Sequence, residues 1–148
     1  EGCLITDGGG NLYGTAQCGG LCASGTVFRL QNGSDTITTL ASFNGRNGAY
    51  PVAGLIADAS GNLYGTTGYG GAGNAGTAFK LMKDSGAITT LANFNGRKGA
   101  YPYGRLIVDA SGNLYGITVN GGVGGYGTIF KITGTPRGDG IPGAAFDV

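Results

Sequence analysis

Histidine and tryptophan are both absent from this sequence of 148 residues, and its only glutamate is Glu1. Without histidine, neither a Ser/His/Asp triad nor a Cys/His pair can form, and the commonest general base and metal ligand of proteins is missing. We therefore expect a protein that is not an enzyme and that binds no metal ion and no cofactor.

Charged residues are also scarce. Lys, Arg, Asp and Glu make up 11% of the chain and leave a formal net charge of +1. A nucleic-acid interface needs clustered Lys and Arg, and a membrane-spanning helix needs roughly 20 consecutive apolar residues. The sequence has neither feature, so we expect no nucleic-acid partner and no membrane span.

Cysteine is the third scarce residue type, with Cys3, Cys18 and Cys22. Three cysteines are too few for a disulfide framework or a four-ligand zinc site. In an oxidising compartment a disulfide between Cys18 and Cys22 could close a small loop. The alternative is a pair of free thiols.

Glycine, in contrast, contributes 34 residues, and some of them mark an internal repeat. The phrase Gly-Asn-Leu-Tyr-Gly-Thr occupies 10–15 and 61–66, and it returns at 112–117 with isoleucine in the last position. Residues 10–60 and 61–111 align without a gap and share 31 of their 51 residues. A period of this length is typical of repeat architectures such as solenoids and propellers.

Each repeat contains four short apolar segments separated by turn residues. In the second copy these segments are 55–59, 62–67, 77–82 and 88–94, and all four have the length of a strand. Tight turns at 58–62 and 83–86 alternate with longer, glycine-containing connections at 68–76 and 95–102. Connections alternate between the two ends of an antiparallel meander, so the longer loops of every repeat should emerge at the same end.

Four antiparallel strands per unit are typical of a propeller blade. The fold class that we predict is an all-β, β-propeller-like tandem repeat with three four-stranded antiparallel blades of about 51 residues. The chain would form a single repeat domain, 1–148, with blades at about 2–47, 52–98 and 103–148, and the third copy diverges from about residue 134. A β-sandwich and a β-solenoid are the alternative folds.

Three blades are fewer than the roughly four to eight with which propellers close. The two outer blades would each leave an apolar face uncovered, so we expect the chain to assemble with copies of itself. Two copies could form a six-bladed ring, or copies could stack head to tail into a filament. A third possibility is that the chain is a piece of a longer array.

Candidate ligand-binding residues lie in the longer loops. Tyrosine can stack on a sugar ring while asparagine and arginine form hydrogen bonds with hydroxyl or carboxylate groups, so a repeated glycan site is chemically reasonable. The alternative is that Asn-Gly forms turns and Tyr-Pro packs between blades. The candidates are Asn44, Arg46, Tyr50, Tyr69, Asn74, Asn95, Arg97, Tyr101, Asn120 and Tyr126.

Two other motifs suggest ligands. Asp7, Asp58 and Asp109 share one position of the repeat, where a carboxylate can cap the turn or bind calcium. A calcium loop carries more carboxylates than one per turn, which favours the capping role. The sequence Arg137-Gly138-Asp139 matches the tripeptide that integrins bind, but a match of three residues is weak support for adhesion.

The repeat also resembles a known family. Its pattern is Leu-Ile-x-Asp-x-x-Gly-Asn-Leu-Tyr-Gly-Thr, then Gly-Thr-x-Phe-Lys/Arg-Leu, then Ile-Thr-Thr-Leu-x-x-Phe-Asn-Gly. This pattern is similar to the tandem repeat named GloVer, found in predicted secreted or surface-anchored bacterial proteins, and more loosely to NHL and SBBP propeller repeats. The resemblance covers two complete copies and about half of the third. It implies a propeller-like fold and an extracellular or cell-surface location, and it implies no reaction.

We therefore predict a secreted or surface-located structural repeat module that is not catalytic and that assembles into a ring or a filament. The alternative function is that of a lectin-like module, which would bind carbohydrate through the end of the blades that carries the longer loops.

Overall fold

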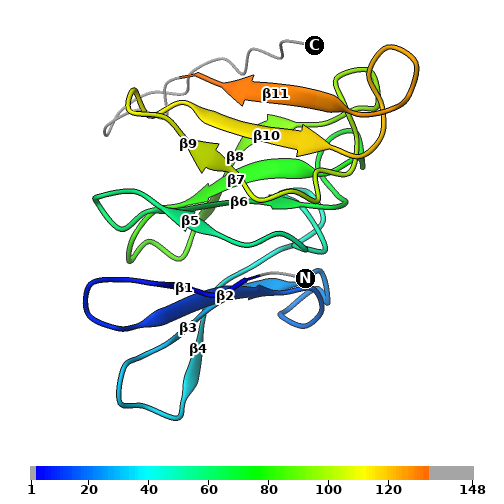
Figure 1. Ribbon diagram of the computed structural model, residues 1–148. Helices are drawn as coiled ribbons and strands as arrows, with labels where there is room; N and C mark the ends of the chain where they lie inside the picture. Colours follow the sequence, from blue (N-terminus) through cyan, green and yellow to red (C-terminus); the bar gives the residue numbers. More distant parts are fainter. Residues whose placement is uncertain (1–2, 134–148) are drawn as a thin grey trace.

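The computed structural model describes residues 3–133 of the chain (Figure 1). These residues form eleven β-strands and no helix, so this part of the chain contains no helix that could cross a bilayer. The strands are β1 (Ile5–Thr6), β2 (Leu12–Ala16), β3 (Thr26–Leu30), β4 (Ile37–Ser42), β5 (Ile56–Ala57), β6 (Leu63–Thr67), β7 (Thr77–Leu81), β8 (Ile88–Asn93), β9 (Ile107–Val108), β10 (Leu114–Thr118) and β11 (Thr128–Ile132).

The strands form three antiparallel sheets, and each sheet corresponds to one repeat. Strands β1 to β4 and β5 to β8 form four-stranded meanders in chain order, and β9 to β11 form a three-stranded one. We call these sheets blades 1, 2 and 3. Figure 1 shows them stacked face to face in an open array. The predicted all-β fold with propeller-like blades is therefore confirmed, while the predicted fourth strand of the third copy lies outside the described residues.

The second copy shows how well side-chain alternation predicts the strands. Strands β6, β7 and β8 agree with the predicted segments to within one residue at each end. Strand β5 is shorter than predicted, because only Ile56 and Ala57 pair with β6. The next residue already belongs to the turn, where the amide of Asp58 donates to the carbonyl of Asn62 at 3.0 Å.

The two ends of the blades differ in their connections, as predicted. Figure 1 shows the tight turns at one end of the stack, on the left, and the longer loops at the other end, on the right. The tight turns are 7–11 and 31–36 in blade 1, 58–62 and 82–87 in blade 2, and 109–113 in blade 3. We call these two ends the tight-turn end and the loop-bearing end.

The hydrophobic core lies between blades. Phe43 of blade 1 packs edge-on against Phe79 of blade 2, with ring centroids 5.0 Å apart. One repeat later, Phe94 of blade 2 packs against Phe130 of blade 3 at 4.8 Å. All four rings are fully buried, and each interface is surrounded by leucine, isoleucine and alanine side chains. The same pair of repeat positions therefore builds both interfaces.

Among residues 3–133, no further blade covers the outer faces of the stack. We call the face toward the preceding blade the rear face and the opposite one the forward face. Leu4 on the rear face of blade 1 is 54% exposed, whereas the equivalent Leu55 is fully buried. On the forward face of blade 3, Ile129 is 69% exposed, whereas the equivalent Ala78 is fully buried. Burial at a given repeat position thus depends on whether another blade covers it.

Candidate functional site

The repeated aspartates of the tight-turn end are held in a dense hydrogen-bond network. Oδ1 of Asp7 accepts from the amides of Gly9 and Asn11 at 2.9 and 3.0 Å. Its Oδ2 accepts from Nδ2 of Asn11 at 2.8 Å and from the hydroxyl of Tyr13 at 2.9 Å. Asp58 and Asp109 form the same four bonds in blades 2 and 3.

This network stabilises the charged form of each aspartate. A hydrogen bond from the Asn11 side chain lowers the pKa of Asp7 to about 2, and one from the Asn113 side chain does the same for Asp109. For Asp58, burial acts to raise the pKa, but the hydrogen bonds from Asn62 and its neighbours outweigh it and the pKa is lowered. An ionised carboxylate has about four acceptor positions, and here all four are used by donors of the turn and of the strand that follows it. The aspartates therefore act as turn caps.

The asparagine of the same motif joins the two tight turns of a blade. Oδ1 of Asn11 accepts from the amide of Asn32 at 3.0 Å, and Oδ1 of Asn62 accepts from the amide of Lys83 at 3.1 Å. Asp-x-x-x-Asn-x-Tyr thus fixes the first turn and attaches the second one to it. The sequence indicated the capping aspartate, but it did not show this second attachment.

At the loop-bearing end, each linker between repeats is bonded to the next blade. Ala49 and Tyr69 exchange two backbone hydrogen bonds of 2.8 and 3.0 Å, and Ala100 and Asn120 pair in the same way across the next interface. The chain approaches closely here, since a Cβ atom on Gly48 would lie 2.6 Å from the side chain of Thr67. The linkers therefore contribute directly to the blade interfaces.

Three of the predicted asparagines stabilise these loops. Oδ1 of Asn44 accepts from the amide of Asn47 at 3.0 Å, and Oδ1 of Asn95 accepts from the amide of Lys98 at 3.1 Å. Oδ1 of Asn74 accepts from the amide of Gly70 at 3.1 Å. The contacts of Asn44 and Asn95 agree with the alternative interpretation of Asn-Gly as turn chemistry. The carbonyl oxygens of all three side chains therefore already have a structural role.

Three of the predicted tyrosines lie together on the loop-bearing end. The ring of Tyr69 is 5.8 Å from that of Tyr50 and 5.1 Å from that of Tyr101, measured between centroids. A fourth ring, Tyr103, lies 6.3 Å from Tyr101. Tyr50, Tyr69 and Tyr103 are exposed, and Tyr101 is half-buried. We call these four residues the tyrosine platform.

Tyr103 was absent from the predicted set because it lies one residue after the predicted linker, 95–102. The signal that could have identified it is the run Tyr101-Pro102-Tyr103, which places two rings on one short extended segment. A side-chain hydrogen bond with Tyr69, together with burial, raises the pKa of Tyr103 to about 12. Its hydroxyl therefore stays protonated in all physiological conditions.

The remaining predicted residues do not join the platform by any ring contact in the described part of the chain. Tyr126 is 94% exposed. Arg46 and Arg97 are exposed at the tips of the two linkers, and the backbone of Asn120 belongs to the bridge with Ala100. Whether any of these residues binds a ligand stays a prediction.

The two ends of the molecule differ in charge. Asp7, Asp35, Asp58, Asp84 and Asp109, which are all the aspartates among the described residues, lie in the tight turns. The longer loops, 17–25, 44–51, 68–76, 95–102 and 119–127, contain no carboxylate and carry only the cations Arg46, Arg97 and Lys98. The loop-bearing end therefore combines exposed aromatic rings with positive charge.

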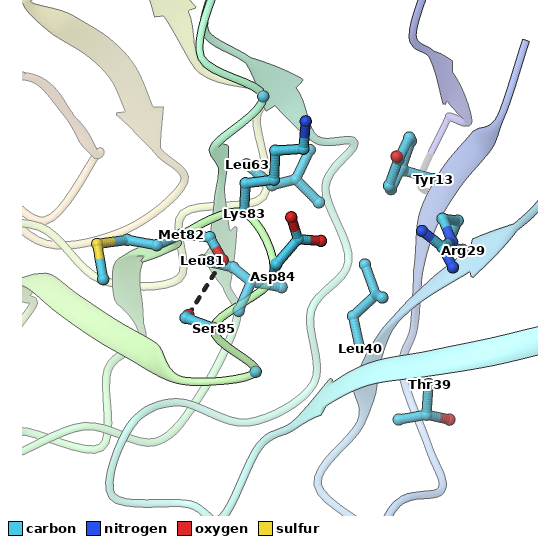
Figure 2. A pocket seen from close by; sticks show the side chains of 12 residues that line it. Tyr13, Arg29, Thr39, Leu40, Leu63, Leu81, Met82, Lys83, Asp84 and Ser85 are labelled. Atoms are coloured by element: carbon cyan, nitrogen blue, oxygen red, sulfur yellow. Dashed lines mark hydrogen bonds between the residues drawn. The ribbon is translucent and has the colours of Figure 1, made fainter. Parts of the chain in front are cut away.

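A pocket of about 320 Å³ lies between blades 1 and 2 at the tight-turn end (Figure 2). Figure 2 shows Lys83 and Asp84 of blade 2 on one side of the gap and Tyr13, Arg29 and Leu40 of blade 1 on the other. Nε of Arg29 is buried and has no hydrogen-bond partner among residues 3–133. Because the pocket presents charges of both signs, its electrostatics select no single class of ligand.

The cysteines, the possible metal ligands and the Arg-Gly-Asp tripeptide do not form a ligand site among the described residues. Cys3, Cys18 and Cys22 are exposed free thiols in the structure, so the pairing of Cys18 with Cys22 in an oxidising compartment stays a prediction. Between residues 3 and 133, no three His, Cys, Asp or Glu side chains are grouped so that they could hold a metal ion. The tripeptide Arg137-Gly138-Asp139 lies outside the described residues.

The repeat seen in the sequence and in the three blades is matched by a known family. Residues 1–139 match the family model described as the Gloeobacter/Verrucomicrobia repeat, in agreement with the predicted GloVer-type resemblance. No curated protein matches the chain. Since the family model spans both complete copies and the described part of the third, the chain belongs to the Gloeobacter/Verrucomicrobia repeat family.

Proposed function

We propose that the chain is a non-catalytic structural repeat module, located outside the cell or on its surface, that assembles with copies of itself. The observation that carries this proposal is the pair of uncovered apolar faces at the two ends of the stack. The forward face of blade 3 in one copy would pack on the rear face of blade 1 in the next copy.

The interface between blades 1 and 2 provides a template for this contact. There, the rear face of blade 2 buries Leu55, Leu63, Phe79 and Leu81 against blade 1. The uncovered rear face of blade 1 carries the same residue types at the equivalent positions, and all four are exposed or only partly buried. These residues are Leu4, Leu12, Phe28 and Leu30.

The forward face of blade 3 is unusually apolar for an uncovered surface. Ile107, Ile117 and Ile129 are all more than half exposed. Ile117 and Ile129 replace Thr66 and Ala78, the equivalent residues of the covered forward face of blade 2. Exposed apolar patches of this kind mark interaction surfaces. A contact between two different faces is heterologous, so it produces a closed ring or an open filament according to the rotation between copies.

The non-catalytic and extracellular parts of the proposal have separate support. The chain has no histidine, and the three repeated aspartates are occupied by turn hydrogen bonds. The resemblance to repeats of secreted or surface-anchored bacterial proteins supports a location outside the cytoplasm.

The experiment is size-exclusion chromatography with light scattering over a range of protein concentrations. We expect particles of several times 14.6 kDa for the chain as it stands. Ile129→Lys should reduce the mass to that of one chain without unfolding it, because this side chain is exposed in the single copy. Val123→Lys is the matched control, since Val123 is exposed but lies in a longer loop, away from the end faces. A single-chain mass for the unmodified protein at all concentrations would refute the proposal.

A second candidate function is carbohydrate binding in the manner of a lectin. The observation that favours it is the tyrosine platform, whose members come from the two linkers on either side of the middle blade and from the longer loop of that blade. This function does not depend on assembly, because the platform is complete within one chain.

A further inference from the structure

The tyrosine platform is built on an unfavourable backbone conformation. Tyr50 and Tyr101 have φ angles of 54° and 58°, in the left-handed region that bulky residues rarely adopt. Both backbones are held there by neighbouring segments. The amide of Tyr50 donates to the carbonyl of Ser24 at 2.9 Å, and the amide of Tyr101 donates to the carbonyl of Ala75 at 2.8 Å. Glycine or asparagine would fit these positions with less strain. Retention of a tyrosine at both positions indicates that the ring itself has a use.

The platform offers the groups that a sugar requires. Its rings provide apolar surfaces on which the C–H face of a pyranose can stack, and its phenol hydroxyls donate and accept hydrogen bonds. A hydrogen bond with Tyr69 raises the pKa of Tyr103, so the hydroxyl of Tyr103 stays in its neutral form. The ring contacts extend without a break from Tyr50 to Tyr103, so several successive sugar units could lie along the platform.

The charges of the two linkers that carry platform tyrosines indicate which sugars the platform prefers. Each linker carries one platform tyrosine and one exposed arginine, Arg46 with Tyr50 and Arg97 with Tyr101, separated by the same number of residues. No aspartate or glutamate occurs in the longer loops, while the described aspartates lie at the opposite end. Arginine recognises a carboxylate through two parallel hydrogen bonds, which a neutral sugar cannot form.

We propose that the loop-bearing end binds an acidic polysaccharide made of uronic acid units. Its pyranose rings stack on the tyrosine platform, and its carboxylates pair with Arg46 and Arg97. This inference rests on the second candidate function and narrows it to one chemical class of glycan. It is independent of assembly through the end faces.

The experiment measures binding of three polymers by titration calorimetry: oligogalacturonate as the uronic acid ligand, dextran as the neutral control and dextran sulfate as a polyanion control. Tyr101→Asn removes a ring while keeping a residue that tolerates the left-handed backbone. It should weaken oligogalacturonate binding about tenfold. Arg97→Gln should weaken it about threefold and reduce its salt dependence. Lys83→Gln, the same loss of charge at the tight-turn end, should leave affinity unchanged.

The polymers separate the possible failures. Equal affinity for dextran and oligogalacturonate would overturn the preference for acidic sugars while carbohydrate binding itself would stand. Binding to neither dextran nor oligogalacturonate would overturn both carbohydrate binding and the preference for acidic sugars. A third outcome is that Arg97→Gln lowers the affinity for dextran sulfate and for oligogalacturonate equally, while Tyr101→Asn lowers neither affinity. This outcome would show a general polyanion effect and would also overturn the inference. Circular dichroism of each variant verifies that the blades remain folded.

Discussion

Blades 1 and 2 have related sequences in different surroundings. Phe28 and Phe79 occupy one repeat position on the rear faces of their sheets, yet Phe79 is fully buried under blade 1 and Phe28 is partly exposed. Hydrophobic stabilisation scales with the apolar area removed from water, so the same residue contributes different amounts in the two blades. In this protein the unit of stability is the interface between two blades, as in other repeat proteins.

The tight turns show the opposite behaviour. Asp7, Asp58 and Asp109 form the same four hydrogen bonds whether their blade is at an end of the stack or in the middle. All the partners lie within six residues of the aspartate, so no neighbouring blade is needed. Stability that depends on a neighbour and stability that is local can therefore be separated by mutation.

The largest expected effect comes from the interface. Phe79→Ala removes a fully buried ring that packs on Phe43, and we expect a loss of about 3–5 kcal/mol in the free energy of unfolding. Phe28→Ala removes the equivalent ring from an uncovered face, and we expect a loss of roughly 1–2 kcal/mol. Urea unfolding at low protein concentration, where copies do not associate, measures both values. Equal losses would contradict the dependence on a neighbouring blade.

The turn network should give an intermediate effect that does not depend on the position of the blade. Asp58→Asn replaces a carboxylate, which only accepts, by an amide whose NH₂ group faces N–H donors. We expect a loss of about 1–3 kcal/mol in the free energy of unfolding. Asp109→Asn should also destabilise the protein, although its blade is at an end of the stack. Tyr115→Phe, which removes one of the four bonds of Asp109, should have a smaller effect. Urea unfolding at pH 7 makes the comparison.

The same network predicts sensitivity to acid. The pKa values of Asp7 and Asp109 are about 2 in the folded protein, below the ordinary value of 3.8 that applies after unfolding. A lowered folded-state pKa stabilises the protein above the unfolded value, and this contribution is lost as the pH falls from about 4 to about 2. Asp109→Asn should make the stability fall less steeply with decreasing pH over this range. An unchanged acid titration, followed by near-ultraviolet circular dichroism, would contradict the role given to the network.

The smallest expected effect concerns one hydrogen bond at each interface. The hydroxyl of Thr66 is buried and donates to the carbonyl of Pro102 at 2.8 Å, whereas the equivalent Thr15 makes longer contacts of 3.5 and 3.4 Å with the carbonyls of Pro51 and Ala53. Thr66→Val should cost about 1 kcal/mol because it leaves a buried carbonyl without its donor. Thr15→Val should cost a few tenths of that amount. Thermal unfolding can rank the two variants, and a larger loss for Thr15→Val would reverse the comparison.

Much of the fold could be predicted because the repeat shows it three times. The apolar alternation in β7 and the turn residues before β6 depend on contacts between residues close in the chain, so a sequence pattern identifies them. The platform was predicted only in part. Tyr50 and Tyr101 share one repeat position and Tyr69 lies in a predicted longer loop, whereas Tyr103 lies just after the predicted linker and was missed. Contacts among these rings join segments that are far apart in the chain, and no local pattern encodes such a distance.

The sequence alone determined the strands, the tight turns and the division into three blades, because period, alternation and turn chemistry act over a few residues. Only the tertiary structure decided which members of identical positions are buried, such as Leu55 but not Leu4, and which loop residues meet, such as Tyr69 and Tyr101. The physical reason is that burial and ring contacts arise from the surface of a neighbouring blade, and a repeat position such as that of Leu4 and Leu55 carries the same residue whether or not that neighbour is present.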